Sequence, residues 1–190
     1  MRAFISVFDK TGVAEFAKGL AEQGFELVST GGTYKELCDK GIPAIEISEI
    51  TGFTELLGGK VKSLHPAIHA GILAYRNKPA DMQSLTDNGV APIDVVVCNL
   101  YPFEEAAKKN ADLPELIENI DIGGVTLLRS SGKNFASVTS VFDPADYAVV
   151  LAEMASNNGE TTYELRKRLA IKSFQYVADY DALIAKELNK

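Results

Sequence analysis

Strand-like and helix-like patterns alternate along the first 50 residues of the chain. Mainly apolar runs at residues 4–7, 25–28 and 44–47 have the length of buried strands. Between these runs, apolar side chains recur at helical spacing, and each helical stretch ends at a glycine, Gly24 or Gly41. This β-α-β-α-β order predicts a parallel sheet with helices on its faces.

The rest of the chain is predicted to extend this sheet. Residues 93–100 contain the run Val-Val-Val-Cys, the most apolar strand candidate, which we expect at the centre of the sheet. Residues 137–141 predict one more strand. Helical patterns occupy residues 80–88, 112–120, 124–133, 143–156 and 161–188, whereas the remainder of 48–90 is less regular. We therefore predict a single α/β domain over residues 1–190, with a mainly parallel central sheet and helices on both faces in three layers.

Composition narrows the class of protein. The chain is 46% hydrophobic and 24% charged, which is ordinary for a soluble globular protein, and its net charge of −7 argues against a nucleic-acid-binding protein. Its apolar runs are too short to span a membrane, and the first residues enter a strand pattern and not a signal peptide. We expect a cytoplasmic protein. Cys38 and Cys98 lack metal-ligand spacing, and we expect both to be buried thiols in a reducing compartment.

Polar residues follow several predicted strands, where ligands bind in parallel sheets. Lys10 follows the first strand, and the segment Ser-Thr-Gly-Gly-Thr at 29–33 follows the second. Glycines in that segment allow close backbone approach, hydroxyls can donate, and a helix N-terminus follows, so the segment suits a phosphate. The alternative is an ordinary βα turn with Thr33 as the helix N-cap. With Lys10 at a neighbouring strand end, a monophosphate is the favoured interpretation.

A second anion-binding candidate is the segment at residues 58–66. Two glycines precede Lys60 and Lys62, which would point the same way if the segment is extended, and the hydroxyl of Ser63 follows. These groups suit a compact anion, and the alternative is a solvated basic loop.

Other candidate residues have ordinary structural interpretations. His65 and His69 stand at i and i+4, but Pro66 lies between them and there is no evident third ligand, so we expect no metal site. Tyr101 could be a core aromatic residue with a solvated hydroxyl, Asp121 a helix cap, and Lys133 a solvated helix end.

Five segments occur in an order that resembles a known family. They lie at residues 6–12, 29–33, 59–66, 98–103 and 120–125, the last continuing to Lys133 and Asn134. Together they resemble the inosine monophosphate (IMP) cyclohydrolase domain, the N-terminal half of the bifunctional purine-biosynthesis protein, over essentially the whole chain. The resemblance implies the methylglyoxal-synthase-like α/β fold. It also implies dehydrative ring closure of 5-formamidoimidazole-4-carboxamide ribotide (FAICAR) to IMP, the final step of de novo purine biosynthesis, without a metal or cofactor.

The resemblance also assigns residues to roles. Four residues are expected to surround the base as catalytic residues: Lys62, Tyr101, Asp121 and Lys133. Asp121 would accept from the carboxamide, Tyr101 and Lys133 would face the developing oxyanion, and Lys62 would lie between phosphate and base. Nine residues are expected to bind the rest of the substrate: Ser6, Lys10, Thr30, Gly31, Thr33, Lys60, Ser63, Asn99 and Gly123.

The implied partners are the nucleotides FAICAR and IMP and a second copy of the chain in a homodimer, with neither nucleic acid nor membrane. The enzyme would be a cyclic-amidine hydrolase run in the ring-closing direction. The transformylase domain of the bifunctional protein is absent, so the chain is expected to be either a stand-alone enzyme, served by a separate transformylase, or a fragment. Lys60 stands where the family usually has arginine, and Ser63 stands where it has threonine.

Two other interpretations remain open. The same fold occurs as a non-catalytic nucleotide-binding effector module, the regulatory domain of carbamoyl phosphate synthetase. That interpretation accounts for the phosphate groups but not for Tyr101, Asp121 and Lys133 together. Methylglyoxal synthase, which acts on a triose phosphate, would account for Lys10 and the 30–33 loop but needs no nucleoside pocket.

Overall fold

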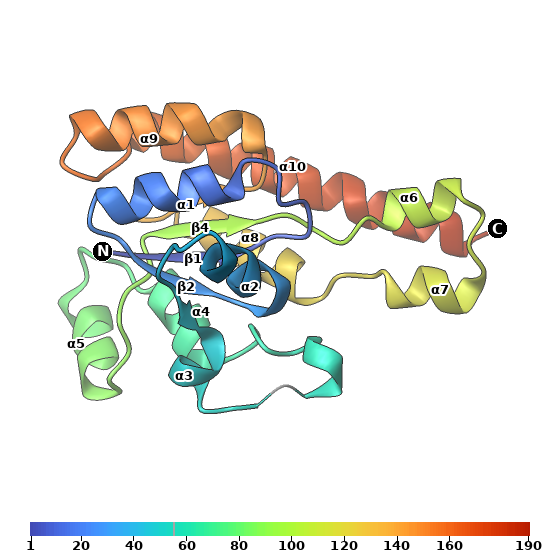
Figure 1. Cartoon of the computed structure of the whole chain (residues 1–190), viewed down its shortest axis with the longest axis horizontal. Helices are drawn as coiled ribbons and strands as arrows, with labels where there is room; N and C mark the ends of the chain where they lie inside the picture. The colour runs from blue at the N-terminus through green and yellow to red at the C-terminus, as the bar shows by residue number, and fades with distance from the viewer. Residues whose placement is uncertain (55) are drawn as a thin grey trace.

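Five strands form a parallel sheet in the order β3-β2-β1-β4-β5 (Figure 1). The computed structural model describes residues 1–54 and 56–190. The strands are β1 Arg2–Ser6, β2 Glu26–Ser29, β3 Ile45–Glu46, β4 Val95–Cys98 and β5 Thr139–Val141. Each pair of neighbouring strands runs parallel. The predicted α/β fold with a central parallel sheet is therefore confirmed.

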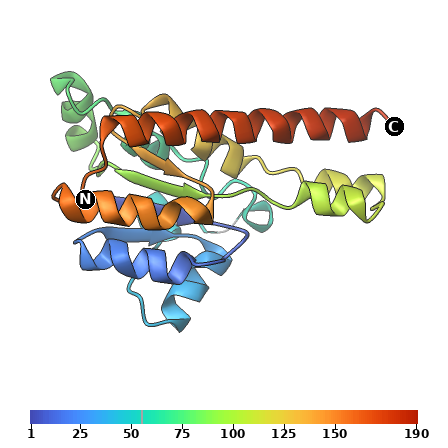
Figure 2. The ribbon, with the colours of Figure 1, turned by 90° about the horizontal axis from the view of Figure 1, so that it is seen from above.

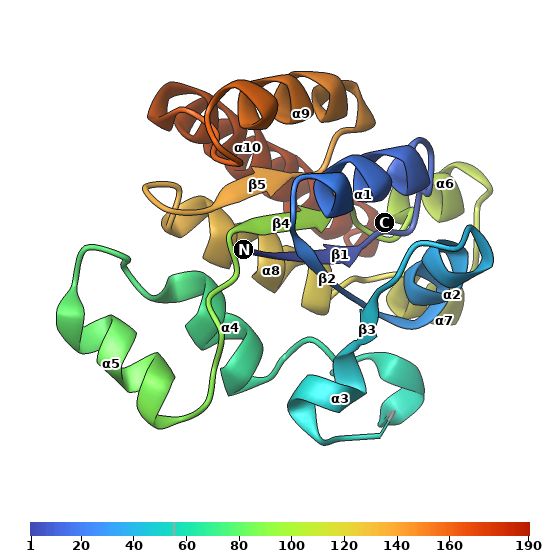
Figure 3. The same cartoon turned by 60° about the vertical axis from the view of Figure 1, so that its left-hand side comes forward.

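Helices connect the strands and cover both faces of the sheet (Figure 3). The longer helices are α1 Val13–Glu22, α2 Gly31–Asp39, α4 Pro66–Leu73, α5 Pro79–Asp87, α8 Gly123–Lys133, α9 Tyr147–Ser156 and α10 Tyr163–Leu188. The shorter ones are α3 Ile47–Thr51, α6 Phe103–Lys108, α7 Leu113–Glu118 and the 3-10 turns η1 Leu57–Gly59 and η2 Pro144–Asp146.

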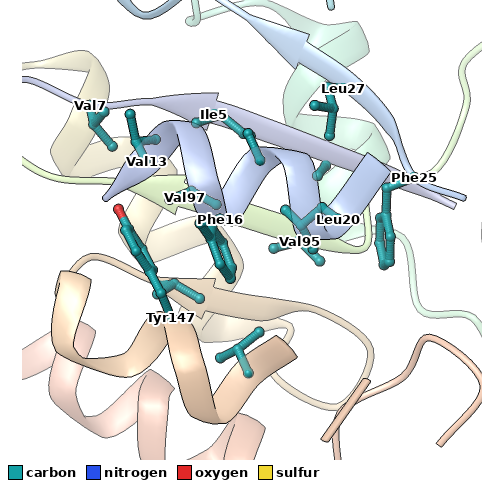
Figure 4. Close-up of a cluster of buried hydrophobic side chains, with 14 of the residues drawn as sticks. Ile5, Val7, Val13, Phe16, Leu20, Phe25, Leu27, Val95, Val97 and Tyr147 are labelled. Atoms are coloured by element: carbon teal, nitrogen blue, oxygen red, sulfur yellow. The ribbon is translucent and has the colours of Figure 1, made fainter. Parts of the chain in front are cut away.

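The first hydrophobic core lies between the sheet and helices α1 and α9 (Figure 4). Ile5 of β1 and Val97 of β4 point to this face. Successive side chains along a strand point to opposite faces, so the residues next to them in sequence point to the other face. Phe16 of α1 stacks on Tyr147 of α9 with ring centroids 4.3 Å apart. This contact joins two helices that are distant in sequence on the same side of the sheet.

The second core lies on the opposite face, under α4 and α8. Phe4 and Val96, the neighbours of Ile5 and Val97, point into it. Helix α10 contributes to both cores, with Leu169 in the first and Val177 in the second. It packs on α8 and on the edge strand β5, and its C-terminal part extends beside the α6–α7 segment (Figures 1 and 2).

Two sequence-based expectations differ from the structure. Helices lie within the less regular region 48–90, and α4 was not predicted because its sequence Pro-Ala-Ile-His-Ala-Gly-Ile-Leu lacks a continuous polar face. Cys38 is exposed, although Cys98 is buried as expected. Leu37 of α2 points into the core, and Cys38 lies about 100° further around the helix, toward solvent.

Within the described ranges, no helix combines the length and the apolar character that crossing a membrane requires.

Candidate functional site

A cavity of about 480 Å³ opens at the carboxyl ends of β1, β2 and β4. The chain runs outward from β1 through β2 to β3, and it returns on the other side of β1 as β4 and β5. Ligands of open parallel sheets bind where the strand order reverses in this way. Most of the predicted site residues line this cavity: Ser6, Lys10, Thr30, Thr33, Lys60, Lys62, Ser63, Asn99, Tyr101, Asp121 and Gly123.

One end of the cavity is a helix N-terminus with two lysines beside it. Helix α2 begins at Gly31, which has a φ of +46° that favours glycine. A Cβ on Gly31 would lie 2.7 Å from Nζ of Lys62, and a Cβ on Gly32 would lie 3.8 Å from Nζ of Lys10. The glycines therefore make room for two ammonium groups next to the positive end of α2, an arrangement that suits an anion.

Hydroxyl groups complete this end of the cavity. Ser6 Oγ and Thr30 Oγ1 are hydrogen-bonded at 2.9 Å. Thr33 Oγ1 accepts from the N–H of Val7 at 3.0 Å and donates to the carbonyl of Val7 at 2.9 Å. The alternative interpretation of Thr33 as the N-cap is wrong, because Thr30 occupies the N-cap position and Thr33 connects α2 to the end of β1.

The segment that carries Lys60 and Lys62 is turned, not extended. It begins with the 3-10 turn η1, in which Gly58 has a φ of +62°. The two lysines consequently point in different directions. Nζ of Lys62 lies beside Gly31, whereas Nζ of Lys60 forms an ion pair of 2.8 Å with Glu118 at the end of α7. The condition under which both lysines would point the same way, an extended segment, is therefore not met.

Asp121 lines the same cavity from the segment just before α8. Its Oδ1 accepts from the N–H of Gly124 at 2.7 Å, and its Oδ2 accepts from the N–H of Tyr101 at 3.3 Å. Burial raises the pKa of Asp121, while these two hydrogen bonds and the charge of Lys62 act in the opposite direction. The carboxylate thus bonds within the first turn of α8, as a capping residue would, and also lines the cavity.

Tyr101 and Phe8 form an aromatic pair at the cavity. Their rings meet edge to face with centroids 5.8 Å apart, and both are about half exposed. Asn99 positions this region: its Oδ1 accepts from the N–H of Phe8 at 2.6 Å, and its Nδ2 donates to the carbonyl of Asp9 at 2.9 Å. Phe8 was not among the predicted site residues, although a large aromatic residue between a strand end and Lys10 could have indicated it.

Two predicted residues do not line the cavity. Gly31 lies beside it and admits Lys62, as described above. Lys133 is exposed at the far end of α8, which is 11 residues long and begins at Gly123. The two ends of this helix are about 15 Å apart. The structure therefore does not bring Lys133 together with Asp121 and Tyr101.

The two histidines have structural partners. His65 Nδ1 accepts from the N–H of Ala67 at 3.2 Å and so caps α4. His69 Nδ1 lies 3.0 Å from Ser130 Oγ, and burial lowers the pKa of His69. Among residues 1–54 and 56–190, no three His, Cys, Asp or Glu side chains are grouped as metal ligands.

Comparison with known families divides the chain into two matched parts. Residues 12–126 match the MGS-like domain, and residues 131–190 match the AICARFT/IMPCHase bienzyme. The boundary between the two matches falls within α8.

Curated relatives match the whole chain. The bifunctional purine biosynthesis protein PurH of Persephonella marina is 51% identical over 189 residues, which are 100% of this chain and 36% of the relative. PurH of Bacillus mycoides is 53% identical over 190 residues, again 100% of this chain and 37% of the relative. The chain thus spans little more than a third of the length of these relatives.

A solved structure has the same fold over the full length of this chain. The crystal structure of ForH superposes with a TM-score of 0.86 at 34% identity, and the match covers 100% of this chain and 99% of that chain.

Proposed function

The chain belongs to the MGS-like domain family, and we propose that it closes the second ring of a purine, converting FAICAR to IMP with loss of water in the final step of de novo purine biosynthesis. Relatives named as bifunctional purine biosynthesis proteins, about half identical over the whole chain, support this proposal. The structural observation that carries it is one cavity lined by both a cationic helix N-terminus and the partly buried carboxylate of Asp121. A nucleoside monophosphate has matching ends, a phosphate and a polar base.

The phosphate would bind where α2 begins. Lys10 and Lys62 supply charge, and the hydroxyls of Ser6, Thr30 and Ser63 can donate hydrogen bonds. Backbone N–H groups of the first turn of α2 point toward an anion in this position. Binding energy from the phosphate would then hold the reacting end of the substrate against Tyr101 and Asp121.

Ring closure requires the carboxamide nitrogen to attack the formyl carbon. This nitrogen is a weak nucleophile because its lone pair is delocalised, so much of the rate must come from holding the two groups in contact. A new C–N bond forms as the formyl C=O π bond breaks; the carboxamide nitrogen loses a proton and the oxygen gains one, which leaves a hydroxyl on a tetrahedral carbon. The nitrogen of the former formamide then loses its proton and forms the ring C=N bond, while the C–O bond breaks and the hydroxyl takes up a proton and leaves as water.

Asp121 and Tyr101 would serve these steps. The carboxylate of Asp121 would accept a hydrogen bond from the carboxamide, and its raised pKa suits a group that takes up a proton. Tyr101 would donate to the developing oxyanion. Lys62 would contribute positive charge between the two ends of the cavity. Lys133, which was also predicted to be catalytic, lies outside this chain's own cavity and would take part only if it reached the cavity of a second copy.

We further propose that residues 1–190 form a single domain, that the protein works in the cytoplasm as a homodimer, and that a transformylase, in the same chain or separate, supplies FAICAR. An absorbance assay for IMP formation from FAICAR tests the activity directly. Formation of methylglyoxal from a triose phosphate would instead favour methylglyoxal synthase. Binding of IMP without any turnover of FAICAR would favour an effector module.

A further inference from the structure

Tyr180 of α10 contacts the backbone at two positions of the loop that carries Asp121. The N–H of Asp121 donates to Oη of Tyr180 at 2.8 Å, and the hydroxyl of Tyr180 donates to the carbonyl of Asn119 at 3.0 Å. Tyr180 itself does not line the cavity of about 480 Å³. Resting on the proposed ring closure, we propose that Tyr180 is a positioning residue that fixes the Asp121 carboxylate from outside the cavity.

The contact matters because residues 119–122 lie between helices. Helix α7 ends at Glu118 and α8 begins at Gly123, so the backbone of Asp121 lies outside regular secondary structure. A catalytic carboxylate must be held within a fraction of an ångström, and a loop achieves this only through contacts with rigid neighbours. Tyr180 supplies a hydrogen-bonding group to each side of Ile120, which fixes the backbone from which the Asp121 side chain extends.

Tyr180 is itself held firmly. Its side chain is buried, its ring meets Phe103 edge to face at 6.2 Å, and it belongs to a helix of 26 residues that packs on α8 and β5. Burial raises the pKa of Tyr180 to about 12, so its hydroxyl stays protonated and can donate and accept at neutral pH.

Tyr176, one turn earlier on α10, makes the corresponding contact with the other loop. The N–H of Leu100 donates to Oη of Tyr176 at 3.4 Å, which is long for a hydrogen bond. Leu100 precedes Tyr101, whose own N–H donates to Asp121. One face of α10 therefore contacts both backbone segments that meet at the Asp121–Tyr101 hydrogen bond, and the longer contact of Tyr176 should matter less.

The first test removes one hydroxyl at a time. We expect Tyr180→Phe to lower kcat about tenfold, the scale of one net hydrogen bond, while KM for FAICAR and Kd for IMP stay within about twofold. Tyr176→Phe should have a smaller effect. The control is Tyr147→Phe, because the hydroxyl of Tyr147 is also buried but has no hydrogen-bond partner among the described residues. Its kcat should match wild type.

The second test asks whether Tyr180 acts through Asp121. In a double-mutant cycle, Tyr180→Phe should reduce kcat much less when Asp121 is already Asn, because the group that it positions is then gone. Equal effects in both backgrounds, or an unchanged kcat in Tyr180→Phe alone, would overturn the proposal.

Amide hydrogen exchange supplies a readout that does not depend on turnover. The N–H of Asp121 should exchange faster in Tyr180→Phe than in wild type, and equal protection would overturn the contact itself. If wild-type protein never cyclised FAICAR, but the Asp121 N–H still exchanged faster in Tyr180→Phe, the proposed function would be refuted. The catalytic part of this inference would fall with it, while the structural contact would stand.

Discussion

Lys60 and Glu118 form an ion pair of 2.8 Å between segments that are 58 residues apart in sequence. Both side chains line the cavity and both are largely exposed, so the pair contributes little to stability. It does change what the cavity offers a ligand, because Lys60 already has a carboxylate partner. A phosphate that bound at Lys60 would have to compete with Glu118 for it.

We therefore expect Glu118→Gln to bind IMP more tightly than wild type, by about two- to fivefold at low salt, on the scale of an exposed ion pair. Titration calorimetry at two salt concentrations measures this, and the gain should shrink at high salt. Glu115→Gln, which removes the same charge from another exposed position on α7, is the control. Equal affinities in Glu118→Gln and wild type would show that Lys60 does not contact the ligand.

Lys10 is expected to contribute directly to phosphate binding. Lys10→Ala should weaken IMP binding by about 1.5–3 kcal/mol, the usual contribution of a hydrogen bond to a charged group. Lys18→Ala removes a lysine from the exposed face of α1, where its neighbour is Glu22, and should bind IMP normally. Unchanged affinity in Lys10→Ala would place the phosphate elsewhere.

Gly124 is expected to be required for activity because a side chain there would displace Asp121. A Cβ added at position 124 would lie 2.7 Å from Leu100 Cδ2 and 2.8 Å from Asp121 Oδ2. Gly124→Ala should lower kcat at least tenfold, although alanine favours a helix. The control is Gly19→Ala in α1, where the new Cβ would meet the flexible end of Leu151. Wild-type turnover in Gly124→Ala would mean that the position of Asp121 is not critical.

Asp121→Asn is expected to lower kcat about 10²-fold or more, the scale of losing one general acid–base group, with little change in Kd for IMP. Because burial raises the pKa of Asp121, the wild-type kcat/KM should fall as the pH is lowered through that raised pKa. The variant should lack this acid limb. A pH–rate profile from pH 4 to 8 measures both, and an identical acid limb in the two proteins would exclude Asp121 as its source.

The same pKa shift predicts how stability responds. The folded protein holds the Asp121 proton more tightly than the unfolded chain does, so Asp121 lowers stability as pH rises through this range. Asp121→Asn cannot titrate, so thermal unfolding should show that its stability, unlike that of wild type, does not fall as the pH rises through this range. A marked loss of stability would mean that lost activity reflects damage to the fold and not to the chemistry.

Lys133→Ala tests the predicted residue that lies apart from the cavity. With about 15 Å of helix between its position and Gly123, we expect kcat to stay within about threefold of wild type. A loss near 10²-fold would contradict this expectation and indicate that Lys133 acts on the cavity of a second copy. Mixing Lys133→Ala with Asp121→Asn would then restore part of the activity.

The sequence predicted the strands and the grouping of residues from different strand ends around one cavity, for a physical reason. Strand ends in a parallel sheet meet at one edge, so residues that follow different strands, such as Lys10 and Thr30, can be placed together without knowing a single contact. The pairing of Lys60 with Glu118 could not be predicted in this way, because it depends on how two irregular segments turn.

Lys133 illustrates a different limit. The helix predicted at 124–133 already separated Lys133 from Asp121 by several turns, but the resemblance grouped the two residues by role and not by distance. Thr33 and Cys38 were misplaced by one turn or less of α2, where the phase of a short helix decides which side chains are buried.

The position of α10 has a consequence for the order in which the protein becomes functional during synthesis. The walls of the cavity come from residues 6–127, which leave the ribosome before α10. Leu127 and Leu128 of α8 share their core with Val177 of α10, and the N–H of Asp121 donates to Tyr180 of the same helix. A nascent chain therefore completes its cavity last, and nucleotide binding should be a property of chains that have folded through residue 180.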